Sequence, residues 1–132
     1  MVTAETILEH THAYGISTIN ENGFPKTLIL QSIMSRFSFV TLYFYLDKNT
    51  DIVKDIQANP KAAIACYAEF DAGYVTMLNL KGTFTLVELD DVTNISEDYK
   101  RYDSNLSYKN PCILLFETLS FDIEKIKKYS GK

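Results

Sequence analysis

The 132-residue sequence contains no tryptophan, and it has only two cysteines, two histidines, three prolines and five glycines. The two cysteines, Cys66 and Cys112, are set among apolar neighbours and are too few for a disulfide framework, so we interpret both as buried free thiols. The scattered glycines exclude a P-loop and a Gly-x-Gly-x-x-Gly phosphate-binding turn. The lack of a Gly-x-Ser-x-Gly turn, and of a histidine close in sequence to either cysteine, argues against nucleophilic catalysis.

The charge balance and the lack of long apolar runs argue against other classes. The chain has 13 Lys plus Arg against 17 Asp plus Glu, a formal charge of −4, and no basic cluster for nucleic acid. No apolar run approaches the roughly 18 residues of a membrane span, and the first residues do not resemble a signal peptide. We therefore expect a cytoplasmic protein. His10 and His12 face different directions on a helix, which predicts surface residues and no metal site.

Apolar and aromatic side chains are abundant. They include nine tyrosines and eight phenylalanines, and hydrophobic residues make up 46% of the chain. A chain of this length and composition predicts a single domain, residues 1–132, with its own core. The aromatic excess favours strands, or a surface that contacts a flat ligand or a second subunit.

The local patterns predict a mainly β fold. Thr3 is a plausible N-cap for the first helix, although Thr6 stands where a capping box has Glu or Gln. Asn22-Gly23 predicts a hairpin turn, and Gly82 inside a long strand predicts a bulge or bend. The expected elements are a helix (3–12), three strands in a meander (15–19, 24–34, 39–46, with a loop at 35–38), a helix ending at Asn59-Pro60, two strands (61–70, 74–89), a polar helix (90–105, with Asp90-Asp91 as turn and cap) and a last strand (112–125). Hairpin connections between most of these strands predict a six-stranded antiparallel barrel with flanking helices.

Three landmarks extend this prediction to a family. They are the hairpin Asn22-Gly23-Phe24-Pro25, the strand–helix unit ending at Asn59-Pro60, and Lys81-Gly82 in the long strand. In this order and spacing the sequence resembles the pyridoxamine 5′-phosphate oxidase-like, FMN-binding split-barrel superfamily, and it is most similar in size to the general stress protein branch. The resemblance implies a six-stranded split barrel, a homodimer, and FMN bound in the grooves between the subunits.

The resemblance also implies a cofactor site near the hairpin strand and the strand–helix loop. Family members carry a basic residue three positions after the hairpin proline and a lysine eight positions before the proline of Asn-Pro; here these positions are Leu28 and Ile52, and Asp51 precedes Ile52. Losing two charge-assisted hydrogen bonds lowers affinity by a factor of about 10² to 10⁴. Lys48, which lies in the same loop as Thr50, is the best candidate to replace the missing basic residues as a cation for the phosphate. The residues implied for cofactor binding are Lys26, Leu28, Tyr45, Leu46, Lys48, Thr50 and Ile52.

Three functions remain open from the sequence. The first is an FMN-dependent oxidoreductase in which the flavin supplies the hydride chemistry, so that no catalytic side chain is required. The second is a binding or regulatory module that keeps the split-barrel dimer but takes another ligand, such as haem, a deazaflavin or an apolar metabolite. The third is a plain antiparallel domain with no pocket. No residue indicates the substrate.

Overall fold

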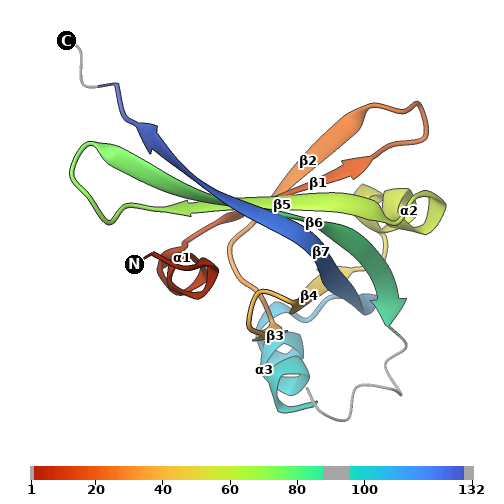
Figure 1. The fold of residues 1–132 in the computed structure, drawn as a ribbon. Helices are drawn as coiled ribbons and strands as arrows, with labels where there is room; N and C mark the ends of the chain where they lie inside the picture. The colour runs from red at the N-terminus through yellow and green to blue at the C-terminus, as the bar shows by residue number, and fades with distance from the viewer. Residues whose placement is uncertain (1, 88–95, 130–132) are drawn as a thin grey trace.

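The computed structural model describes residues 2–87 and 96–129 and shows one antiparallel sheet with three helices (Figure 1). The sheet does not close, and its strand order is β2-β1-β5-β6-β7-β4-β3. The mainly β split-barrel fold expected from the sequence is confirmed. In chain order the elements are α1 (Ala4–His10), β1 (Tyr14–Ile19), β2 (Pro25–Leu30), β3 (Ser35–Phe37), β4 (Thr41–Asp47), α2 (Asp51–Ala58), β5 (Lys61–Ala68), β6 (Tyr74–Val87), α3 (Ser96–Leu106) and β7 (Pro111–Lys127).

The number and pairing of the strands differ from the expectation. The sheet has seven strands rather than six, because Ser35–Phe37, in the expected loop, pairs with β4 as a short edge strand. The expected three-strand meander is wrong, since β4 pairs with β7 and leaves β2 at the other edge of the sheet. The strand β7 is 17 residues long, and its first part pairs with all of β4, from Thr41↔Glu117 to Asp47↔Pro111. The local sequence pattern of a strand does not indicate which distant strand it pairs with.

The core lies between one face of the sheet and the helices α1 and α2. The predicted apolar face of α2, formed by Ile52, Val53 and Ile56, is buried against it. Phe84 meets Phe44 and Phe116 edge-on, with ring centroids 6.0 and 5.0 Å apart. Burying a large apolar side chain contributes about 1.5–3 kcal/mol, so this face of α2 is enough to fix the helix on the sheet.

Gly82 stands at an irregularity in the ladder between β6 and β7. The register shifts between Lys81 and Gly82, which confirms the predicted bulge. A Cβ atom at Gly82 would overlap the carbonyl oxygen of Glu117 and lie 2.8 Å from a ring carbon of Phe116. The two long strands cross the middle of the molecule as a bent, twisted pair (Figure 1). A residue without a side chain is therefore needed where the strands approach most closely.

The first helix corrects a detail of the sequence interpretation. Thr3 is the N-cap of α1 as expected, and the capping box is complete even though its third position is Thr6. The Thr3 hydroxyl accepts from the Thr6 amide (3.2 Å), and the Thr6 hydroxyl accepts from the Thr3 amide (2.8 Å). The Thr6 side chain therefore reaches the Thr3 amide and completes the capping box, a role for which Glu or Gln is usual.

Other expectations concern scattered residues. Cys66 and Cys112 are buried free thiols, as predicted. Asp90-Asp91, and the adjoining parts of the expected strand and helix, lie outside the described residues. Within the described parts of the chain, no helix is long and apolar enough to cross a membrane.

Candidate functional site

A pocket of about 410 Å³ lies where the β1–β2 hairpin meets the N-terminus of α2, and we refer to it as the hairpin–α2 pocket. It forms because α2 packs its apolar face onto the core side of the sheet, which brings the loop before α2 beside β2. Four of the seven residues implied for cofactor binding meet here: Lys26, Leu28, Thr50 and Ile52. The full lining is Thr18, Lys26, Thr27, Leu28, Asn49, Thr50, Asp51 and Ile52.

The other three implied residues lie elsewhere. Leu46 is buried in the main core, whereas Tyr45 belongs to a separate cluster on the opposite face of β4. This separation follows from the alternation of side chains along a strand. Lys48 does not line the pocket; its amide donates to the carbonyl oxygen of Asn110 (2.7 Å).

An ion pair within the chain occupies the mouth of the hairpin–α2 pocket. Lys26 Nζ lies 2.9 Å from Asp51 Oδ2, and both side chains are about half exposed or more (46% and 69%). The hydrogen bond raises the pKa of Lys26 and lowers the pKa of Asp51, so both groups are charged at neutral pH. The sequence suggested Lys26 as a possible cation for a ligand, and the structure gives that cation a resident partner.

Thr18 is a pocket residue that the sequence interpretation missed. Its side chain is 1% exposed, and its hydroxyl has no hydrogen-bond partner among the residues that the structure describes. Cross-strand pairing with Lys26 and Ala62 places all three side chains on the core side of the sheet, the side on which the pocket opens. A signal was present, because a polar residue occupies the third inward position of β1 after Tyr14 and Ile16. A buried hydroxyl without a partner costs about 1–3 kcal/mol, which a ligand bound in the pocket would recover.

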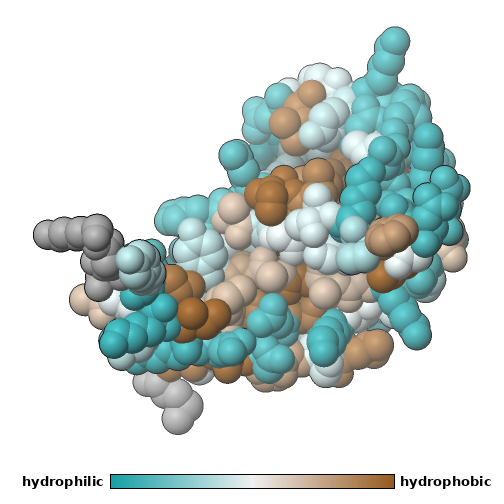
Figure 2. Space-filling view, turned by 90° about the horizontal axis from the view of Figure 1, so that it is seen from above, coloured by the Kyte–Doolittle hydropathy of each residue, from teal (hydrophilic) through white to brown (hydrophobic). Residues whose placement is uncertain are grey.

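A second cavity of about 400 Å³ lies on the other face of the sheet, and we refer to it as the outer groove. Ser17, Ala63 and Lys81 form a cross-strand row beside the buried row of the core, so they point away from it. Of the residues that the structure describes, only Thr18 lines both the outer groove and the hairpin–α2 pocket. Figure 2 shows a hollow across the middle of the molecule that is lined largely by apolar and weakly polar side chains. The groove is lined by Ser17, Thr18, Ile19, Pro25, Lys61, Ala62, Ala63, Lys81, Gly82, Thr83 and Leu119.

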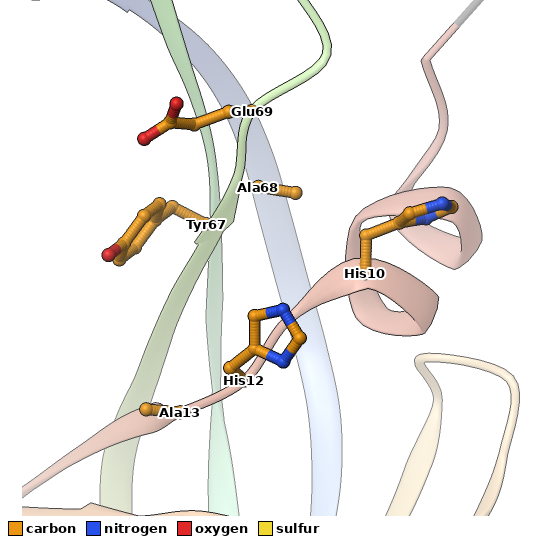
Figure 3. A pocket seen from close by; sticks show the side chains of 6 residues that line it. All are labelled: His10, His12, Ala13, Tyr67, Ala68 and Glu69. Carbon is orange, nitrogen blue, oxygen red and sulfur yellow. The ribbon is translucent and has the colours of Figure 1, made fainter.

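A third cavity of about 370 Å³ lies between α1 and the end of β5 (Figure 3). His10 Nδ1 donates to the carbonyl oxygen of Thr6 (2.9 Å), and the His10 ring packs edge-on against Phe70 with centroids 5.3 Å apart. Glu69 is paired with Lys128 (3.1 Å). Both histidines are exposed, as predicted. Among the described residues, no three His, Cys, Asp or Glu side chains are grouped to hold a metal.

The tyrosine excess has a structural use away from these cavities. Tyr45 donates its hydroxyl to Asp103 (2.6 Å) and stacks on Tyr108, with centroids 5.3 Å apart and planes at 21°. Its ring also meets the edges of Tyr99 and Tyr102 of α3. Burial and the Asp103 carboxylate both raise the pKa of Tyr45. These side chains fix α3 to the sheet.

The fold is shared with solved structures, whereas no family model and no curated protein matches the sequence. The Agrobacterium tumefaciens protein Atu2129, of unknown function, has a TM-score of 0.72 at 16% identity over 92% of this chain, which spans only 54% of that protein. A candidate pyridoxamine 5′-phosphate oxidase from Listeria innocua has a TM-score of 0.68 at 13% identity, covering 88% of this chain and 90% of its own. A general stress protein 26-related protein from Clostridium acetobutylicum has a TM-score of 0.62 at 16% identity, covering 88% and 85%.

Other structures with this fold are described as an F420 reductase, a FAD-binding protein from Mesorhizobium loti and a heme binding protein from Mycobacterium smegmatis, with TM-scores of 0.67, 0.70 and 0.71. The identities lie between 8% and 17%, so the likeness concerns the fold. The chain therefore has the split-barrel fold of pyridoxamine 5′-phosphate oxidase-like proteins, as the sequence resemblance implied.

Proposed function

We propose that this chain is a flavin-binding oxidoreductase of the split-barrel class, active as a homodimer, with the flavin in the hairpin–α2 pocket. The observation that carries the proposal is the meeting of Lys26, Leu28, Thr50 and Ile52 in one pocket. These residues come from two segments about 25 positions apart, and the family resemblance implies cofactor contacts in both. The FAD-binding and F420-reducing proteins with the same fold support a flavin-type ligand.

In this proposal the residues of the chain bind and orient the flavin and do not themselves react. A bound flavin supplies hydride or electron transfer, and the protein positions its ring and excludes competing reactions. Leu28 and Ile52 offer apolar contact, while the hydroxyls of Thr18 and Thr50 are hydrogen-bonding groups for the hydroxylated chain of a flavin. These residues fit the uncharged parts of FMN. They do not fit its phosphate, because Lys26, the one cation that the described part of the chain places in the lining, is already paired with Asp51.

A second copy of the chain is the expected partner. Two observations support it: the second half of β7, from residue 120 to 127, pairs only with β6 within the described residues, and large apolar side chains are exposed nearby. A free strand edge beside apolar side chains is a typical association surface. Exposed apolar side chains on β7 are Leu119 (77%), Phe121 (47%), Ile123 (38%) and Ile126 (41%), and Val40 (46%) lies beside the strand, since its carbonyl oxygen accepts from the Thr118 amide. Sedimentation showing only a 15.1 kDa monomer at micromolar concentration would contradict the homodimer.

The visible spectrum of the purified protein tests the flavin proposal. We expect flavin absorbance, or quenching of flavin fluorescence when riboflavin or FMN is added to colourless protein. Mass spectrometry of the released ligand then identifies it. Colourless protein that quenches neither flavin at micromolar concentrations refutes the proposal.

A non-enzymatic ligand-binding module is the second candidate, and the Lys26–Asp51 ion pair favours it. The heme binding protein with the same fold supports a ligand other than a flavin. The two candidates differ in redox turnover. A loaded enzyme oxidises NADH or NADPH faster than the same concentration of free flavin does, whereas a binding module does not.

A further inference from the structure

We propose that the hairpin–α2 pocket selects an unphosphorylated flavin, with a neutral hydroxyl-bearing chain, over FMN. This inference rests on the proposed function, since it concerns the ligand of the same pocket. It follows from three features of the lining: a carboxylate at the helix end, the surrounding charges, and a buried hydroxyl without a partner.

The first feature is the position of Asp51 in the first turn of α2. A helix N-terminus attracts anions, and here the helix's own carboxylate is the anion. Asp51 is held there by Lys26, with the two charged atoms 2.9 Å apart. A ligand phosphate placed at this end of α2 would meet a carboxylate and would have to take Lys26 from it.

The second feature is the charge around the pocket mouth. A neighbouring cavity of about 360 Å³ shares Lys26 and Asp51 and is also lined by Glu21, Lys54 and Asp55. Two lysines therefore face three carboxylates at the mouth. A phosphate monoester carries about −1.5 to −2 charges at neutral pH, so it enters a region with no surplus of positive charge.

The third feature is the chemistry of the pocket wall. Leu28 and Ile52 make part of it apolar. The Thr18 hydroxyl is buried and has no partner within residues 2–87 and 96–129, and it can donate and accept one hydrogen bond each with a ligand hydroxyl. Thr50 donates to the carbonyl oxygen of Asp47 (3.0 Å) and keeps acceptor capacity toward the pocket. An uncharged polyol chain satisfies these groups without disturbing the ion pair.

Riboflavin and FMN make a matched pair of probes, because they differ only in the phosphate. Fluorescence titration of the full chain should show riboflavin binding more tightly than FMN. Asp51→Asn should tighten FMN binding about tenfold and leave riboflavin within about twofold, because only the phosphate meets the removed charge. Asp71→Asn is the matched control. It breaks a similar exposed ion pair, to Lys125 at 2.7 Å, away from the pocket and should change neither affinity.

Thr18→Val tests the buried hydroxyl. It should weaken riboflavin binding about fivefold or more while the ligand-free protein unfolds at the same or a higher temperature, because the unpartnered hydroxyl is gone. Unchanged riboflavin affinity in this variant would remove Thr18 from the site and overturn its part in the selection.

The outcomes separate the inference from the proposed function. FMN binding to the unaltered protein as tightly as riboflavin, or more tightly, overturns the inference and supports a flavin site. Failure of both flavins to bind overturns the proposed function and the inference with it. Equal tightening of both flavins in Asp51→Asn also overturns the inference, because the carboxylate would then not act on the phosphate.

Discussion

Replacing Gly82 with alanine should strongly destabilise the protein. A Cβ atom at this position overlaps the carbonyl oxygen of Glu117 and comes within 2.8 Å of the Phe116 ring. The obstructing oxygen is main chain of the paired strand, so it can move only if the bulge between β6 and β7 moves with it. No backbone strain is involved, since Gly82 does not have a positive φ angle. The effect is therefore steric.

The expected magnitude follows from the closeness of that approach. Inserting a methyl group into a packed region costs about 1–3 kcal/mol, and main-chain obstruction places this substitution at the upper end, about 3 kcal/mol. For a domain of this size, each kcal/mol lowers the Tm by about 3–6 °C, so we expect a fall of about 9–18 °C. With a urea m value of about 1–3 kcal/mol/M, the unfolding midpoint should fall by about 1–3 M.

Thermal and urea unfolding followed by circular dichroism measure this effect, with Gly15→Ala as the control. Gly15 lies in β1 of the same sheet, and the nearest atoms to its Cβ position are 3.7 Å away, an ordinary contact distance. Alanine there should leave the Tm unchanged or raise it slightly through the unfolded state. An unchanged Tm in Gly82→Ala would refute the close approach. An equal fall in Tm in both variants would mean that replacing any strand glycine destabilises the sheet, and that the close approach at Gly82 is not the cause.

Three further outcomes are expected. Tyr45→Phe should lower the free energy of unfolding by about 1–2 kcal/mol, measured in urea, because it removes the 2.6 Å hydrogen bond to Asp103; an unchanged value would mean that this contact does not hold α3. Burial raises the pKa of Cys112 to about 11 from 9.0, so the unfolded state loses its thiol proton first and the free energy of unfolding should fall from pH 9 to pH 11. Cys112→Ala should flatten that fall in urea titrations at pH 8, 10 and 11, and an identical slope would contradict the assignment. Thr3→Ala should cost about 1 kcal/mol by opening the capping box, whereas Thr3→Ser should cost much less; equal losses would show that the cap hydroxyl is unimportant.

Local patterns in the sequence determined most of the elements. The spacing of Ile52, Val53 and Ile56, followed by Asn59-Pro60, predicts α2 because a helix and its stop depend on residues within a few positions of one another. The hairpin at Asn22-Gly23 is equally local, and Gly23 has the positive φ angle that favours glycine there. Gly82 inside a strand pattern likewise predicts a bulge from local sequence. It does not predict which strand approaches the glycine.

Only the tertiary structure decided which strands pair and which side chains meet. The pairing of β4 with β7, which replaced the expected meander, joins segments about 70 residues apart. The same holds for the candidate site: the Lys26–Asp51 ion pair and the burial of Thr18 both require α2 to be docked on the sheet. The local sequence does not indicate such an ion pair. A surface lysine or aspartate has the same kind of sequence neighbours whether it forms an ion pair or not. The sequence alone therefore pointed to the hairpin strand and the loop before α2 as a candidate site, and only the folded chain shows that Lys26 and Asp51 pair there.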